Sequence, residues 1–151
     1  MARGKRWLIV GGIGMLFGAL LHLAALLGGP YWIAFVGAPP SVVRSAEAGT
    51  LLAPVSTFAI IGLLVVWALY AFSGAGILRQ LPFRRLMLAA VAVIFTLRGL
   101  VILPFLHRVD WRSMHDLFVV FSSGFILAIG ASYALGLWLT LRHAKSAAVA
   151  S

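Results

Sequence analysis

Cysteine is absent from the 151-residue sequence, and this absence excludes disulfides, cysteine-ligated metals, covalently attached c-type haem and thiol redox chemistry. Charge is also scarce. Asp, Glu, Lys and Arg make up 10% of the residues, against about a quarter in soluble proteins. Hydrophobic residues make up 63%, so the chain cannot be an ordinary water-soluble domain, and most of it must have lipid as its solvent.

The apolar residues fall into four runs, at about 7–28, 51–76, 86–106 and 114–141. Each run is long enough to cross a hydrocarbon core about 30 Å thick as a helix. We therefore predict a single domain, residues 1–151, folded as an all-α membrane bundle of four transmembrane helices. The first run is longer than the apolar part of a signal peptide, which is about 7–15 residues, and is interpreted as a spanning helix.

Local signals predict where the helices begin and end. Thr50 is expected to cap the second helix, and Pro104 marks the fraying end of the third. Ser113 and Asp116 have the spacing of a capping box at the start of the fourth helix. In the outer loop, residues 29–50, two prolines predict a turn that is followed by a short helix closed by glycine.

Basic residues are divided unevenly between the two sides that the four runs define. Eight of the 12 Lys and Arg lie on the side of the termini: Arg3, Lys5, Arg6, Arg79, Arg84, Arg85, Arg142 and Lys145. The opposite side has Arg44, Arg108 and Arg112, partly offset by Glu47 and Asp110. The positive-inside rule therefore predicts that both termini of this multi-pass protein are cytoplasmic. The cations form no groove, so the net charge of +9 does not indicate a nucleic-acid partner.

Arg98 needs an explanation because it lies inside the third apolar run, where a charge costs about 2.5–3.5 kcal/mol at mid-bilayer on translocon scales. His22 is predicted at a similar depth in the first helix. Other polar residues complete the same outer layer: Glu47, Ser56, Thr57, Ser122 and Ser123. We hypothesise an outward-facing cavity in which Arg98 offers a positive charge to an anionic group and His22 hydrogen-bonds or titrates.

A structural interpretation of these residues stays open. Arg98 would then pair with Glu47 or Asp116 near the outer surface, and His22 and the hydroxyls would join helices through hydrogen bonds. A weak surface pair between Arg44 and Glu47 is an equally fair expectation.

Small residues recur at every fourth position in two of the runs, where they would let helices approach closely. Gly14 and Gly18 share a face of the first helix with His22. The fourth helix has a longer stripe: Gly124, Ala128, Ser132 and Gly136.

Other chemistries need features that the sequence does not supply. Haem held between two imidazoles would need a second histidine in the bilayer beside His22, but the others fall in a connection or the tail: His107, His115 and His143. A serine hydrolase built from Ser122 or Ser123 with His22 lacks a nucleophile turn and an oxyanion hole. We expect no cofactor and no metal.

Three segments carry a resemblance to known proteins: Leu21-His22-Leu23 through Gly28-Gly29-Pro30, the tryptophan and proline downstream, and Leu97-Arg98-Gly99. Together they resemble small bacterial four-helix membrane proteins of unknown function. The resemblance covers most of the chain and implies an inner-membrane location, but it supplies no reaction and no catalytic residue.

The sequence thus favours a non-enzymatic function. We expect binding of a lipid or small amphipathic molecule, or support of a membrane-protein partner or homo-oligomer, through the outer cavity and the small-residue stripes. The alternatives are an oligomeric transporter of protons or a small anion, and a small membrane enzyme. A transporter needs a continuous polar path, and an enzyme needs a carboxylate or nucleophile beside His22.

Overall fold

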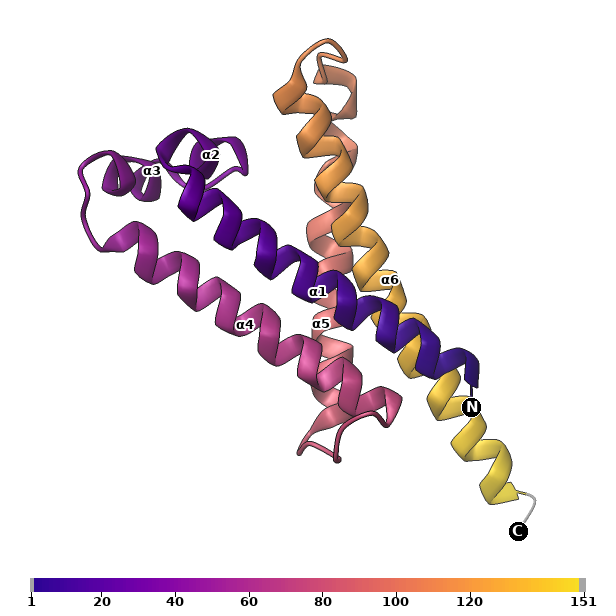
Figure 1. Ribbon diagram of the computed structural model, residues 1–151. Helices are drawn as coiled ribbons and strands as arrows, with labels where there is room; N and C mark the ends of the chain where they lie inside the picture. Colours follow the sequence, from indigo (N-terminus) through magenta and orange to yellow (C-terminus); the bar gives the residue numbers. More distant parts are fainter. Residues whose placement is uncertain (1, 150–151) are drawn as a thin grey trace.

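The computed structural model describes residues 2–149, with side chains for residues 3–142, and this part of the chain is helical and contains no strand (Figure 1). Four helices are long and apolar enough to cross a membrane, as predicted. The elements are α1 (Ala2–Gly28), α2 (Pro30–Phe35), α3 (Pro40–Glu47), α4 (Leu52–Ala75), α5 (Arg84–Leu100), the 3-10 helix η1 (Leu103–Arg108) and α6 (Met114–Val149).

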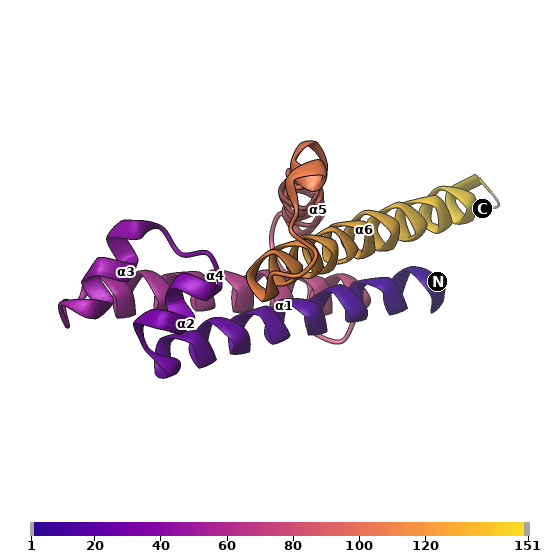
Figure 2. The ribbon, with the colours of Figure 1, turned by 90° about the horizontal axis from the view of Figure 1, so that it is seen from above.

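The long helices form two antiparallel pairs that diverge from each other. Helix α1 packs along α4, and α5 packs along α6 (Figure 1). The pairs are joined mainly by contacts between α1 and α6, and they splay apart toward one end. We call that end, with residues 29–51 and 101–113, the loop end. The opposite end, with the start of α1, the end of α6 and residues 76–83, is the terminal end (Figure 2).

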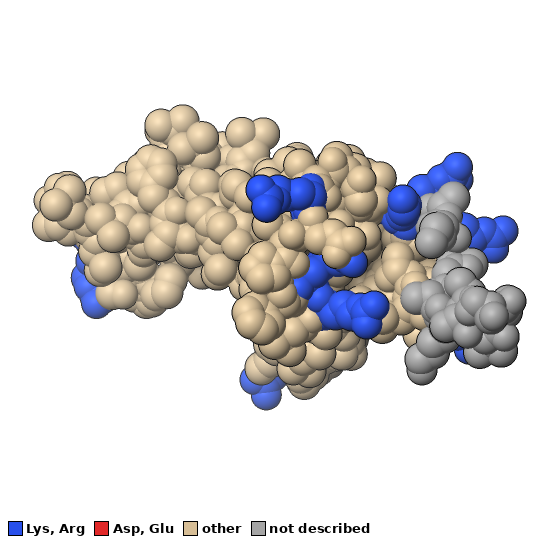
Figure 3. All heavy atoms as spheres, turned by 90° about the horizontal axis from the view of Figure 1, so that it is seen from below, with Lys and Arg blue, Asp and Glu red and all other residues tan. Residues whose placement is uncertain are grey.

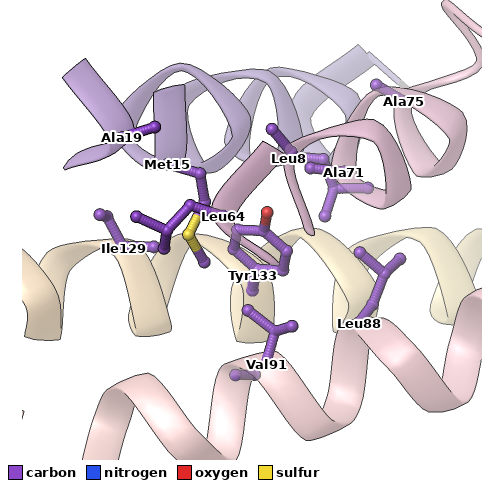
Figure 4. Close-up of a cluster of buried hydrophobic side chains, with 12 residues drawn as sticks. Leu8, Met15, Ala19, Leu64, Ala71, Ala75, Leu88, Val91, Ile129 and Tyr133 are labelled. Atoms are coloured by element: carbon purple, nitrogen blue, oxygen red, sulfur yellow. The ribbon is translucent and has the colours of Figure 1, made fainter. Parts of the chain in front are cut away.

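The core lies where the pairs meet. It is a cluster of buried apolar side chains from all four long helices, among them Leu8, Met15, Leu64, Val91 and Tyr133 (Figure 4). Tyr133 is completely buried, and its hydroxyl donates a 2.8 Å hydrogen bond to the carbonyl of Trp67 in α4. This bond joins α6 to α4 across the interface between the two pairs.

The closest helix contacts depend on glycine. A methyl group placed on Gly130 of α6 would lie 2.6 Å from the backbone nitrogen of Thr96 in α5. A methyl group on Gly99 of α5 would lie equally close to the Cβ of Leu127 in α6. The α5–α6 pair therefore owes its tight packing to two glycines that lie outside the predicted stripes.

Two helix ends differ from the prediction of spans at 86–106 and 114–141. Helix α5 ends at Leu100, and a short 3-10 helix follows. Pro104 explains this end, because its ring would clash with the carbonyl of Leu100 four residues earlier and it has no N–H to donate. Helix α6 extends well beyond residue 141, since Ala and Lys are good helix formers. The side chain of Lys145, counted in the charge pattern, lies outside the described residues.

Thr50 does not cap the second long helix as expected. The cap is supplied by Ser45 of α3, whose Oγ accepts a 2.9 Å hydrogen bond from the N–H of Ala53. Thr50 instead contacts Ser45, with 2.7 Å between the two hydroxyl oxygens. The predicted short helix in the loop exists as α3, whereas α2 was not predicted.

The capping box at the start of α6 is half formed. Ser113 Oγ accepts a 3.3 Å hydrogen bond from the N–H of Asp116, as predicted. The Asp116 carboxylate, however, accepts a hydrogen bond from the N–H of Asp110 at 3.0 Å and not from that of Ser113. The N–H of Ser113 already donates to the carbonyl of Asp110, which leaves the carboxylate free to stabilise the preceding turn.

Candidate functional site

A cavity of about 290 Å³ lies between the two helix pairs on the loop-end side of the core. All four long helices line it, and its floor consists of Met15, Leu64 and Ile129, which are buried members of the core cluster. Its volume is at the lower end of the range for ligand sites, about 300–1,000 Å³. The remaining lining is mostly apolar, with Phe95, Phe118 and Phe125 among its residues.

Helix α2 lies beside the cavity at the loop end. Val36, which directly follows α2, is one of the lining residues. Phe35 packs against Phe118 of α6, with ring centroids 4.8 Å apart, and against His115 at 5.9 Å. These contacts connect α2, in the loop after α1, to the first turns of α6.

His22 and Arg98, the two residues on which the sequence hypothesis depends, line this same cavity from α1 and α5. Ser122 joins them from α6. The other residues of the hypothesis lie elsewhere. Ser56 and Thr57 are in the first turns of α4, Glu47 ends α3, and Ser123 faces a neighbouring cavity between α5, η1 and α6.

The imidazole of His22 has a defined hydrogen-bonding state. Its Nδ1 lies 2.8 Å from the carbonyl oxygen of Gly18, one helical turn earlier. A carbonyl oxygen only accepts, so Nδ1 carries a hydrogen and donates it. In the neutral ring Nε2 is then an acceptor, and in the protonated ring it becomes a second donor. Among residues 3–142 nothing is hydrogen-bonded to Nε2.

Arg98 lies in the last turn of α5, where a cation interacts favourably with the helix dipole. Its side chain is exposed and lines both the main cavity and the neighbouring one of about 260 Å³. The predicted ion pair with Glu47 or Asp116 does not form. Within the described side chains the one ion pair joins His115 and Asp116, at 3.5 Å.

Glu47 also forms no ion pair with Arg44, contrary to expectation. Both side chains are exposed on the short helix α3, where water solvates each charge and an i,i+3 pair gains little. No carboxylate side chain of the described residues therefore forms an ion pair with Arg98.

The hydroxyl groups of the polar layer bond to their own helices. Ser56 and Thr57 donate to the carbonyl of Ala53, and Ser122 donates to the carbonyl of Val119 at 3.0 Å. These bonds satisfy the hydroxyls within one turn and do not join neighbouring helices. Tyr133 of α6, by contrast, donates a hydrogen bond to another long helix, at the carbonyl of Trp67 in α4. Ser132 precedes it in the same apolar run, and nothing in the sequence distinguished Tyr133 for that role.

Half of the small-residue stripe of α6 packs against α1. Gly136 lies against Leu8, where an added methyl group would be 2.6 Å from Cγ, and Ser132 is buried near Gly11. Gly124 and Ala128 are exposed, because α1 packs at that level against Phe125 and Ile129 instead. In α1, Gly14 packs against Ile129, and Gly18 lies 3.7 Å from Leu64 by the same measure.

The geometry of the described residues supports neither a metal site nor a serine hydrolase. No three His, Asp or Glu side chains of residues 3–142 are grouped so that they could hold a metal ion. No hydrogen bond between His22 and Ser122 or Ser123 is formed in the described part of the chain.

Comparison of the chain with protein-family models, with curated proteins and with solved structures gives no significant match. The function must therefore be argued from the cavity and its chemistry.

Proposed function

We propose that this integral membrane protein is a binding protein for one small amphiphile with an anionic head group. The observation that supports the proposal is the convergence of Arg98 and His22, from helices of different pairs, on one cavity with an apolar floor. The head group would pair with Arg98, and the first part of the tail would lie against Met15, Leu64 and Ile129.

The electrostatics favour an anion. The sequence has three acidic residues, and none of them forms an ion pair with Arg98. A guanidinium beside apolar walls interacts with an anion more strongly than it would in water, because the local dielectric constant is lower. Its two parallel N–H groups suit a carboxylate or a phosphate.

His22 supplies the second polar contact. Because Nδ1 is bound to the Gly18 carbonyl, the group available to a ligand is Nε2. Nε2 accepts from a protonated head group, and after protonation it donates to an ionised one. Ser122 contributes little to anion binding, since its hydroxyl hydrogen is already donated to Val119.

Transport and catalysis are less well supported. Below the cavity floor lie completely buried residues, including Leu8, Val91 and the ring of Tyr133, so a single chain offers no polar path toward the terminal end. An acid–base mechanism needs a partner for His22, and no carboxylate side chain lines the cavity.

The experiment compares a twelve-carbon carboxylate with the corresponding alcohol as ligands for the purified protein in neutral detergent. Native mass spectrometry measures the bound mass, and thermal unfolding measures the stabilisation. We expect the carboxylate, and not the alcohol, to raise the unfolding temperature. Arg98→Ala should abolish the effect, whereas Arg112→Ala, which removes another exposed arginine at the loop end, should retain it.

Two results would contradict the proposal. One is equal binding of the carboxylate and the alcohol, which would mean that Arg98 does not recognise the head group. The other is retention of carboxylate binding by a folded Arg98→Ala protein. If Arg98→Ala does not fold, Arg98→Lys, which keeps the charge but loses the planar fork, should weaken binding of the carboxylate measurably.

A further inference from the structure

The terminal end concentrates positive charge without any acidic residue. The three acidic residues of the chain are Glu47 and Asp110, which belong to the loop end, and Asp116, which lies beside it in the first turn of α6. Lys and Arg groups spread over the face that includes the terminal end, and no Asp or Glu is visible on it (Figure 3). No Asp or Glu side chain of the chain therefore lies at this end to neutralise the cations.

Two of these arginines line cavities at the terminal end, one of which lies between helices. Arg84 and Arg85, at the start of α5, line one cavity of about 140 Å³, which α4 and α6 complete. They also line an adjacent cavity of about 360 Å³ formed with the loop before α5. Arg85 is exposed and makes no ion pair or hydrogen bond with the described side chains.

The position of Arg84 is fixed by the loop that precedes it. The completely buried Ser73 donates a hydrogen bond to the carbonyl of Arg79 at 2.8 Å and accepts one from the N–H of Leu81 at 3.0 Å. The guanidinium of Arg84 then donates to the carbonyl of Ser73 at 3.2 Å and is half-buried. The loop and the first arginine of α5 are thus pre-organised.

The smaller cavity combines this charge with hydrocarbon. Leu88, Leu137 and Leu141 line it together with the two arginines and Thr140. Phe83, immediately before α5, is 78% exposed. A phosphate bound by the arginines would have apolar surface beside it for the start of an acyl chain. Basic pockets between transmembrane helices bind anionic lipid head groups in this way.

We infer that Arg84 and Arg85 form a second ligand site, which binds the phosphate of an anionic phospholipid at the terminal end. This site is separate from the cavity that contains Arg98. Charges that only orient a protein in the membrane need a position in a loop and nothing more. Arg84 and Arg85 are also placed around cavities, one of them by a hydrogen bond, which charge-based orientation does not require.

The test measures lipid binding to the full chain by native mass spectrometry in neutral detergent. The probes are phosphatidylglycerol, the zwitterionic phosphatidylcholine and inorganic phosphate. We expect tighter binding of phosphatidylglycerol than of phosphatidylcholine. Arg85→Gln should weaken phosphatidylglycerol binding about fivefold, the contribution of one cation near a lipid surface. Arg85→Lys should retain most of it.

Arg44→Gln is the matched control, because it removes one exposed cation at the loop end. An unchanged affinity in this variant, with the loss in Arg85→Gln, supports a local site. An equal loss in both variants would overturn it in favour of diffuse attraction. Competition by inorganic phosphate at the concentration of the lipid would overturn the lipid assignment in favour of a soluble phosphate. Equal binding of the two lipids would also refute it.

Discussion

Phe35 and Phe118 pack with their ring centroids 4.8 Å apart and their planes inclined at 42°, although one ends a short helix of the first loop and the other begins the last membrane helix. The contact places α2 against α6 at the end where the two helix pairs diverge. Phe118 also lines the cavity of His22 and Arg98, so the contact lies at the edge of that cavity.

Replacing Phe35 with alanine should loosen the contact between α2 and α6. Loss of the contact with Phe118 is expected to lower the free energy of unfolding by about 1 kcal/mol, the usual contribution of an aromatic pair. It should also speed dissociation of a twelve-carbon carboxylate. Thermal unfolding and ligand release, followed by native mass spectrometry, measure the two effects. Trp111→Ala, which removes an exposed aromatic side chain at the loop end, should leave the release rate unchanged.

Gly130 and Gly124 of α6 should respond oppositely to alanine. A methyl group on Gly130 would lie 2.6 Å from the backbone of Thr96, so Gly130→Ala should destabilise the protein by about 1–3 kcal/mol. Nothing lies within 4 Å of a methyl group on Gly124, and Gly124→Ala should be neutral or stabilising by up to about 1 kcal/mol. Unfolding in detergent measures both. Equal losses would show that α6 packs differently.

Ser45→Ala should loosen the start of α4. The change removes the acceptor of the Ala53 N–H and the partner of the Thr50 hydroxyl. We expect a loss of about 1 kcal/mol in the free energy of unfolding, as for other helix caps. Faster amide hydrogen exchange at Ala53 would locate the effect. Ser41→Ala, an exposed residue of α3 with no such bond among the described residues, should change neither quantity.

Tyr133→Phe isolates the hydrogen bond to the Trp67 carbonyl while preserving the buried ring. Interhelical hydrogen bonds in membranes contribute about 0.6 kcal/mol on average and up to about 1.7 kcal/mol, so a loss in this range is expected. The free energy of unfolding is the measurement. Tyr70→Phe is the control, since the hydroxyl of this half-buried tyrosine makes no hydrogen bond in the described structure. An equal effect in the control would argue against the Tyr133–Trp67 bond.

The absence of cysteine makes the predicted topology directly testable. Ser41→Cys and Gln80→Cys introduce single exposed thiols at the loop end and the terminal end. With the termini in the cytoplasm, a membrane-impermeant thiol reagent should label the first in intact cells and the second only after lysis. The opposite pattern would reverse the orientation that the basic residues predict.

The amino-acid sequence by itself predicted the class of protein, the number of membrane helices and the short helix α3. These depend on the length and polarity of continuous segments, which lipid constrains strongly because every backbone group must be satisfied within the helix. The sequence also singled out Arg98 and His22, because a cation or imidazole inside an apolar run is costly wherever the run folds. It gave no reason to place Ser45 as the cap of α4, since that contact joins separate elements.

Only the tertiary structure decided which of the polar residues share a cavity. Equal depth in the bilayer grouped Ser56, Thr57, Ser122 and Ser123 with His22, but rotation about each helix axis determines where a side chain points. That rotation is fixed by contacts such as Gly130 against Thr96 and Tyr133 against Trp67, which involve residues far apart in the chain. The divergence of the helix pairs then leaves the cavity above Ile129, which residues of both pairs line.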